Sequence, residues 1–307
     1  MVDVNTPSTD PSGIEAARLA DYTTFQLGGP CRRLFACETP AAVQSTVQRL
    51  VAAATPYTLI GGGSNLLVAD EGIDTVVVRY FTDQPLMVFH GECVEVSGST
   101  LLDHLVRDAV ERGMDGVTHC SGIPGTVGGA IAGNAGAFGR QLGDQVEHVD
   151  VIDSHGAVVR VRAEEAGFAY RSSRFQESGE IILSARLRLR TAGQAAVRAE
   201  RESILGLRRD KHPDWRREPC IGSIFRNIEP SSAAERRQAA GWFLEKAGAK
   251  SLRVGGACVY PKHANIIIKG EDGTAADVLA LIQQMREVVR KRFQFELQPE
   301  VRWLGND

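Results

Sequence analysis

The chain of 307 residues is 43% hydrophobic and 24% charged, which is the composition of a folded protein long enough for two or three domains. A net charge of −3 gives no electrostatic basis for binding nucleic acid or an anionic membrane, and no apolar run approaches the roughly 18 residues of a membrane span. Residues 1–18 lack the apolar core of a secretory signal, so we predict a flexible polar leader and a cytoplasmic protein.

The first half of the chain contains short strands and a glycine-rich loop. A predicted strand at 57–60 leads into Gly61-Gly62-Gly63-Ser64-Asn65, and another strand follows at 75–79. A Rossmann dinucleotide site needs an amphipathic helix directly after its glycines, so this strand, loop and strand argue against one. A strand at 94–98 and a helix over 101–112, ending at Gly113, come next.

A second glycine-rich segment runs from Ser121 to Gly139. Glycine loses conformational entropy in regular structure, so we expect neither an ordinary helix nor a strand here. Exposed main-chain N–H groups in such loops suit a phosphate. Two such loops predict an extended ligand with a pyrophosphate, held by main chain at both places; the alternative is two tight turns.

The second half is predicted to contain strands, a hairpin and helices. Strands are expected at 146–153, 157–161 and 181–189, with a hairpin turn at 154–156. Arg186, Arg188 and Arg190 alternate and are interpreted as one solvated face. A charged helix over 193–210 leads to a late α/β unit with a helix at 241–247, a strand at 264–269 and a helix over 274–293 capped by Thr274.

Three short polar clusters stand between apolar segments, at 170–175, 222–227 and 299–302. Each cluster alone is typical of a surface loop. The sequence contains no G-x-S-x-G, Walker A or H-E-x-x-H motif, its seven histidines stand apart, and its six cysteines form no Cys-x-x-Cys pair. We therefore predict no metal site and interpret the cysteines as reduced thiols.

Seven motifs in one order resemble the UDP-N-acetylenolpyruvoylglucosamine reductases, flavoenzymes of peptidoglycan synthesis. They are residues 22–29, 61–67, 121–139, 170–175, 222–227, 263–265 and 299–305. The short interval between Arg171 and Ser223 is similar to the family's shorter form, which lacks a substrate-capping insertion. The resemblance implies an α+β fold of the vanillyl-alcohol-oxidase (PCMH) type. Two α+β FAD-binding subdomains, at 19–79 with 296–307 and at 80–204, would be joined by a C-terminal α/β substrate-binding domain at 205–295.

The resemblance also implies a reaction. NADPH would reduce non-covalently bound FAD, and a hydride would then pass to the enolpyruvyl group of UDP-N-acetylglucosamine enolpyruvate, giving UDP-N-acetylmuramate. Arg171 and Glu300 would stabilise the charge that develops on the substrate, and Ser223 would protonate the α-carbon. The final strand, with Glu300, would return to the flavin.

The binding residues follow from the same motifs. Implied substrate contacts are Tyr170, Lys211, Asn227 and His263. Implied FAD contacts are Gly61, Gly62, Gly63, Ser64, Asn65, Ser121, Ile123, Pro124, Gly125, Thr126, Gly128, Gly129, Asn134, Gly136 and Arg302. Arg226, Ile228 and Lys269 depart from the family pattern, and arginine for lysine keeps charge but not geometry.

Two alternatives stay open at this point. The first is another FAD-dependent oxidoreductase of the same fold, in which His119 or Cys120 beside the second loop could attach the flavin covalently. The second is a non-catalytic protein that binds flavin or a nucleotide sugar.

Overall fold

The computed structural model describes residues 13–229 and 237–305, so most of the predicted leader at 1–18 lies outside the described residues. Contacts group the described chain into two compact units. Unit 1 comprises residues 13–16, 32–62 and 75–205; unit 2 comprises 17–31, 63–74, 206–229 and 237–305. The predicted division into a leader and three domains does not coincide with these units and stays a prediction.

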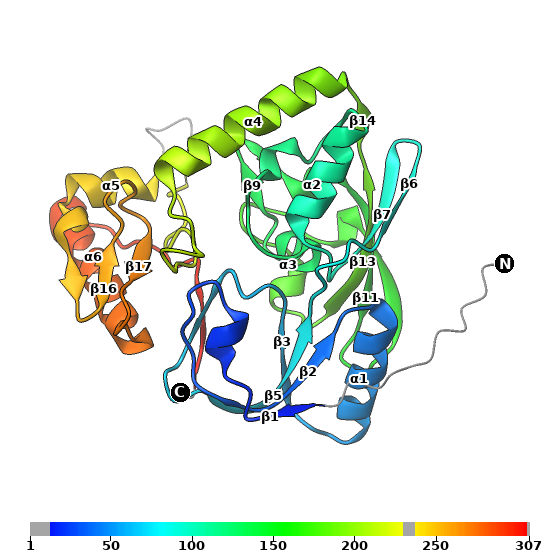
Figure 1. The fold of residues 1–307 in the computed structure, drawn as a ribbon, viewed down its shortest axis with the longest axis horizontal. Helices are drawn as coiled ribbons and strands as arrows, with labels where there is room; N and C mark the ends of the chain where they lie inside the picture. Colours follow the sequence, from blue (N-terminus) through cyan, green and yellow to red (C-terminus); the bar gives the residue numbers. More distant parts are fainter. Residues whose placement is uncertain (1–12, 230–236, 306–307) are drawn as a thin grey trace. The chain divides into compact units, whose positions relative to one another are not determined.

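Unit 1 contains a mixed sheet with the strand order β1-β2-β5-β3 (Figure 1). Its strands are β1 (Ile14–Glu15), β2 (Cys31–Cys37), β5 (Ile73–Tyr80) and β3 (Tyr57–Ile60), and β3 runs parallel to β5. Helix α1 (Pro40–Ala52) links β2 to β3; it starts with proline, and the Thr39 side chain accepts a hydrogen bond from the Ala42 N–H. Val43, Val47 and Leu50 share one face and pack on Val76 and Val78.

The second sheet of unit 1 is antiparallel, with the order β12-β11-β13-β7-β6. Its strands are β6 (Met87–His90), β7 (Cys93–Ser97), β11 (Val146–Ile152), β12 (Val158–Arg162) and β13 (Ile181–Arg188). Helices α2 (Leu102–Glu111) and α3 (Val127–Ala132) are labelled beside this sheet in Figure 1. Their apolar residues are buried in one core with the sheet. The predicted hairpin between β11 and β12 is present, closed by the Asp153 N–H donating to the Ala157 carbonyl.

Smaller elements complete unit 1. They are β8 (Met114–Asp115), β14 (Arg190–Thr191), β9 (Gly136–Ala137), β10 (Arg140–Gln141), and the 3-10 helices η2 (Thr118–Cys120), η3 (Leu142–Gln145), η4 (Ala163–Glu165) and η5 (Arg174–Gln176). Helix α4 (Gln194–Lys211) crosses the division between the units at residues 205 and 206.

The described part of unit 2 combines short sheets with helices. Strand β4 (Leu66–Val68) pairs in parallel with β18 (Arg302–Leu304), and β15 (Arg253–Val254), β16 (Ala257–Val259) and β17 (Ile267–Lys269) form an antiparallel sheet. Its helices are η1 (Leu19–Tyr22), α5 (Ala240–Lys246), η6 (Ala249–Ser251) and α6 (Ala275–Phe293). Thr274 caps α6 as predicted, accepting a hydrogen bond from the Asp277 N–H.

Two expectations about elements are wrong. The segment 121–139 was expected to hold no helix, yet α3 forms within it because Val127, Ala130 and Ile131 are buried and Thr126 caps its start. The glycine at 128 also lets the helix lie close to Gly98, whose carbonyl oxygen would be 3.1 Å from an added Cβ. The predicted strand at 264–269 begins only at Ile267, because the carbonyls of Asn265 and Ile266 accept hydrogen bonds from Ile224 and Tyr260.

The arginines expected on one solvated face have specific partners. Arg186 and Arg188 form ion pairs with Glu147 on the sheet, whereas Arg190 lies on β14 and pairs with the buried Asp115. The reason is that β13 ends at Arg188 and the chain then pairs with β8. None of the helices in the described part of the chain combines the length and apolar composition that crossing a bilayer requires.

Candidate active site

The two glycine-rich loops meet within unit 1. A Cβ added to Gly61 would lie 2.7 Å from Thr126 Oγ1, and one added to Gly62 would lie 3.1 Å from the Gly125 Cα. Both distances are shorter than ordinary van der Waals contact, so only glycine allows the loops to approach this closely. The two loops therefore approach each other closely, with Gly62 against the main chain of Gly125 and Gly61 against the side chain of Thr126.

The first amides of α3 are already bonded within the protein. The Val127 N–H donates to the Thr100 carbonyl, the Gly128 N–H to the Gly98 carbonyl, and the Gly129 N–H to Thr126 Oγ1. The expectation that exposed N–H groups of this segment face a phosphate is therefore wrong for these three residues. The physical reason is that the helix start is anchored on the turn after β7.

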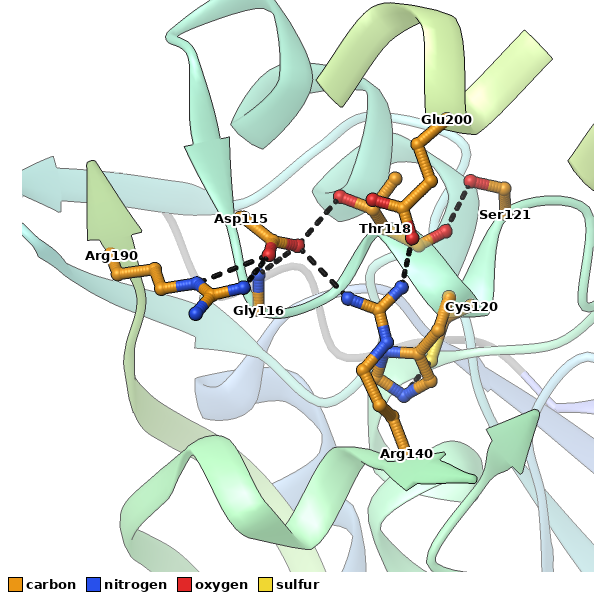
Figure 2. A network of polar contacts seen from close by, with 9 residues as sticks. Asp115, Gly116, Thr118, Cys120, Ser121, Arg140, Arg190 and Glu200 are labelled. Atoms are coloured by element: carbon orange, nitrogen blue, oxygen red, sulfur yellow. Dashed lines mark hydrogen bonds and ion pairs between the residues drawn. The ribbon is translucent and has the colours of Figure 1, made fainter. Parts of the chain in front are cut away.

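A buried carboxylate supports the start of the second loop, as Figure 2 shows. Asp115, 5% exposed, accepts hydrogen bonds from the Gly116 N–H at 2.7 Å and from Thr118 Oγ1 at 3.2 Å. Arg140 and Arg190 form ion pairs with the same carboxylate, and Arg140 also pairs with Glu200 of α4. Asp115 is partly desolvated, yet the arginines and the Gly116 N–H hold its pKa below the usual value. Ser121, a predicted FAD contact, donates from Oγ to the Thr118 carbonyl at 2.6 Å and is fully buried.

His119 and Cys120 lie beneath the second loop rather than on its surface. Both are 0% exposed, and Cys120 Sγ lies 3.3 Å from His119 Nε2. Burial, followed by the nearby Arg140 charge, lowers the pKa of His119 from 6.5 to about 4. Covalent attachment of a flavin to either residue would require this segment to open.

Arg171 lies at the third position of a tight turn in unit 1. The Ala169 N–H donates to the Ser172 carbonyl at 3.0 Å, and the Ser172 N–H donates back to the Ala169 carbonyl at 3.2 Å. Between them, Arg171 has a φ of +52°, the left-handed conformation that costs free energy for a bulky residue. Its guanidinium carbon is 5.8 Å from the centre of the Tyr170 ring. Backbone strain of this kind concentrates at functional sites.

Asn134 and Ser173 hold this turn in place. Asn134 is 1% exposed; its Nδ2 donates to the Ala169 carbonyl at 2.8 Å and to Gln141 Oε1 at 3.0 Å, and its Oδ1 accepts from the Gly143 N–H at 2.9 Å. Ser173 is 3% exposed and its Oγ donates to the Ala132 carbonyl at 2.7 Å. The family resemblance implies that Asn134 contacts FAD, and it gives no role to Ser173. The structure gives both side chains protein partners.

In unit 2, the end of the first glycine-rich loop contacts the segment that carries Glu300. Asn65 Nδ2 donates to the Glu300 carbonyl at 3.1 Å, and the Arg302 N–H donates to the Asn65 carbonyl at 3.1 Å. Gly63 has a φ of +62°, and an added Cβ would lie 2.1 Å from the Tyr22 carbonyl oxygen. Glycine is therefore required at this bend.

Ser223 lies on the segment next to Glu300. The Glu300 N–H donates to the Ile224 carbonyl at 2.7 Å, so the residue after Ser223 is directly bonded to Glu300. On the other side, Ser223 forms a β-bridge with Ile266. The side chain of Asn265, 2% exposed, accepts from the Phe225 N–H at 3.0 Å and donates to the Phe225 carbonyl at 2.9 Å. Unit 2 thus brings together Ser223 and Glu300, and Asn265 is a supporting residue that the sequence did not single out.

A basic region of unit 2 includes two further predicted substrate contacts. Lys211 ends α4, and the rings of His212 and His263 lie 5.3 Å apart. Burial, then the charge of Arg208, lowers the pKa of His212 to about 4; burial also lowers the pKa of His263. Asn227 accepts from the first N–H of α5, that of Ala240, at 3.2 Å.

The predicted site residues are divided between the units. Unit 1 contains Gly61, Gly62, Ser121, Ile123, Pro124, Gly125, Thr126, Gly128, Gly129, Asn134, Gly136, Tyr170 and Arg171. Unit 2 contains Gly63, Ser64, Asn65, Lys211, Ser223, Asn227, His263, Glu300 and Arg302.

Comparison with known families finds two matching profiles. Residues 213–304 match the profile of the UDP-N-acetylenolpyruvoylglucosamine reductase C-terminal domain, and residues 31–162 match that of an FAD binding domain. The predicted fold class is confirmed as an α+β fold with an FAD-binding domain followed by a C-terminal domain.

Individual relatives agree over nearly the whole chain. The UDP-N-acetylenolpyruvoylglucosamine reductase of Heliobacterium modesticaldum is 38% identical, covering 94% of this chain and 89% of that protein; the one from Bacillus velezensis is 33% identical, covering 96% and 94%. A crystal structure of the Thermus caldophilus reductase (MurB) is 30% identical with a TM-score of 0.77, covering 96% of this chain and 98% of that one. The chain therefore belongs to the UDP-N-acetylenolpyruvoylglucosamine reductase family.

Proposed function

We propose that the chain reduces UDP-N-acetylglucosamine enolpyruvate to UDP-N-acetylmuramate with FAD as cofactor and NADPH as hydride donor, in the cytoplasm. The observation that carries the proposal is the pairing of the Ser223 segment with the Glu300 segment through the Glu300 N–H and the Ile224 carbonyl. A hydroxyl and a carboxyl are thereby presented by neighbouring main-chain segments, in a chain of this reductase family.

The residues of the two glycine-rich loops fit FAD. Gly62 lies against the Gly125 main chain and Gly61 against the Thr126 side chain, so the two glycine-rich segments converge, which suits a cofactor with a long pyrophosphate spine. Bound FAD would supply the redox chemistry, accepting a hydride from NADPH and passing it to the CH2 carbon of the enolpyruvyl group. The burial of His119 and Cys120 favours non-covalent binding.

Three side chains supply the polar chemistry. Addition of hydride to the CH2 carbon pushes negative charge onto the neighbouring α-carbon and its carboxylate. Arg171 and Glu300, the latter as a neutral carboxylic acid, stabilise that charge as fixed hydrogen-bond donors, and the loss of one such donor typically costs about 3–4 kcal/mol. Ser223 donates its hydroxyl proton to the α-carbon, which completes the reduction of the double bond.

The remaining predicted contacts orient the substrate. Lys211 binds the diphosphate of the UDP group, and Tyr170, Asn227 and His263 contact the rest of the substrate. The departures at Arg226, Ile228 and Lys269 affect substrate affinity rather than the chemical step, because none replaces Arg171, Ser223 or Glu300.

The Ser223→Ala variant tests this function. Purified, FAD-loaded variant should lose its flavin absorbance on mixing with NADPH at the wild-type rate. Return of that absorbance on adding the enolpyruvyl substrate without oxygen should slow about a hundredfold or more, because the proton donor is missing.

A Ser251→Ala variant is the matched control, since the exposed Ser251 hydroxyl, at the end of η6 in the same unit, donates to the Gly248 carbonyl. Normal substrate turnover by Ser223→Ala would show that Ser223 is not the proton donor. Wild-type protein that binds FAD but never transfers electrons to the substrate would overturn the proposed function as a whole.

A further inference from the structure

We propose that Asn134 is a positioning residue for Arg171: it fixes the turn that presents the guanidinium to the substrate and does not itself contact the substrate. The inference rests on the proposed function, because it concerns the step in which Arg171 acts. It also assigns Asn134 a role different from the FAD contact that the sequence motif implies.

The carboxamide of Asn134 has several protein partners. Both of its N–H groups donate, to the Ala169 carbonyl and to Gln141 Oε1, and its oxygen accepts the Gly143 N–H. The residue is 1% exposed and has a φ of +40°, a conformation that asparagine tolerates better than most residues. Both donors of the amide are therefore used inside the protein.

The contact with Ala169 acts on the Arg171 turn directly. The Ala169 carbonyl closes the turn by accepting the Ser172 N–H at 3.2 Å, and the same oxygen accepts Asn134 Nδ2 at the shorter distance of 2.8 Å. Only Tyr170 separates Ala169 from Arg171, whose left-handed backbone costs free energy. The bond from Asn134 thus contributes to holding a conformation that the local sequence does not favour.

A second side chain fixes the other arm of the turn. Ser173 Oγ donates to the carbonyl of Ala132, the last residue of α3. Asn134 follows the same helix by two residues, so both arms of the turn are attached to its end. Helix α3 lies in the second glycine-rich segment. The Arg171 turn is therefore attached by hydrogen bonds to the segment predicted to hold FAD.

The packing around Asn134 leaves little room for another side chain. An added Cβ on Gly143 would lie 2.8 Å from Asn134 Oδ1 and 2.7 Å from the Phe168 ring. Residue 143 must be small so that its N–H can reach the carboxamide. The segment at 141–143 and the more distant Ala169 thereby converge on one amide.

Removal of this amide should impair the substrate half of the reaction and spare the other half. Displacement of a catalytic group by about 1 Å can cost about a hundredfold in rate. Reduction of the flavin by NADPH does not involve Arg171 in the proposed scheme. A loss confined to substrate reduction would therefore mark a positioning role.

Two variants and one control separate the possibilities. Asn134→Gly keeps the left-handed backbone without strain and removes the amide; Asn134→Asp keeps the acceptor for Gly143 but loses the donor to Ala169. Gln141→Ala removes another partner of Asn134 and leaves the Ala169 contact. For both Asn134 variants, reoxidation of chemically reduced enzyme by the enolpyruvyl substrate should slow about tenfold to a hundredfold, with flavin reduction by NADPH and FAD content unchanged. Gln141→Ala should behave like wild type.

A double-mutant cycle and amide exchange complete the test. In an Arg171→Met background, Asn134→Gly should slow substrate reduction by less than about twofold further, because the group it positions is gone. Hydrogen exchange of the Ser172 amide should accelerate in Asn134→Gly while amides of α3 keep their protection.

Additive losses in the cycle, equal losses in both half-reactions, or unchanged Ser172 exchange would each overturn the proposal. The exchange measurement needs no substrate, so its result stands even if the wild-type protein fails to reduce the enolpyruvyl compound. That failure would count against the proposed function and leave the role of Asn134 in the turn measurable.

Discussion

At the scale of single residues, the buried side-chain amides of Asn134 and Asn265 form hydrogen bonds with main-chain groups in irregular segments, where no neighbouring strand supplies them. Asn265 pairs with both polar groups of Phe225 and so keeps the Ser223 segment extended where no regular strand continues. Sequence motifs included Asn265 and Asn134 but could not give their roles. Their partners lie 40 and 35 residues away, and such distant pairings leave no local pattern.

Some residues could be identified from the sequence because their chemistry depends on neighbours in the same motif. Gly63 precedes Ser64 at a bend with positive φ, and Thr274 caps the helix that follows it. Ser223 and Glu300 were singled out through the resemblance, and their adjacency became visible only in the folded chain.

His119 should make stability depend on pH. Its pKa falls from 6.5 to about 4 on folding, so between these values the unfolded chain binds more protons. The contribution is present above pH 6.5 and is lost as the pH falls toward 4, amounting to about 3 kcal/mol. Urea titrations across this range should show a shallower pH dependence for His119→Phe than for wild type.

Burial also lowers the pKa of His212 to about 4, so the stability of the His119→Phe variant should still depend partly on pH. Parallel profiles for wild type and His119→Phe would show that His119 is not a source of the effect.

At the scale of elements, the close approach of the two glycine-rich loops is the feature that a single methyl group should disturb. Gly61→Ala places a Cβ at 2.7 Å from Thr126 Oγ1, which also caps α3. Overpacking costs about 1–3 kcal/mol, so the dissociation constant of FAD should rise about tenfold or more. Equilibrium titration of FAD-free protein with FAD, followed by flavin fluorescence, measures the change.

Gly193→Ala is the matched substitution, since an added Cβ there meets nothing within 4 Å. It should leave FAD affinity unaltered. If Gly61→Ala binds FAD as tightly as Gly193→Ala, the contact between the loops does not shape the cofactor site.

Elements with strong periodicity were predictable from the sequence, and short or atypical ones were not. The helix predicted over 101–112 forms at Leu102–Glu111, and the strand predicted at 57–60 forms as such. Helix α3 was missed because tertiary burial of Val127 and Ile131 outweighs the low helix propensity of its glycines. Strand β4 has three residues, and its partner β18 lies near residue 302, too far for a local signal.

At the scale of the whole molecule, the chain passes repeatedly between the two units. The core of unit 2 contains Phe25, Leu27 and Leu67 together with residues from 221 to 297. The sequence, with the resemblance, predicted the fold class but grouped these early residues elsewhere, because only packing reveals which distant apolar side chains share a core.

A fragment of residues 206–307 should therefore not fold by itself. Without Phe25, Leu27 and Leu67 it loses fully or almost fully buried side chains, each worth about 2–5 kcal/mol in a core. Circular dichroism during urea titration should show no cooperative transition for the fragment, whereas the full chain should show one. A cooperative transition in the fragment would mean that these three residues are dispensable.

The bond from Thr24 Oγ1 to the Cys220 carbonyl spans 196 residues, and it has a consequence for biosynthesis. While the ribosome makes the intervening polypeptide, Phe25 and Leu27 have no native apolar partners from the later segment and stay accessible to other proteins. At about 5–20 residues per second, that interval lasts on the order of ten to forty seconds. Nascent chains should accordingly depend on holdase chaperones during translation more than chains whose cores are built from consecutive segments.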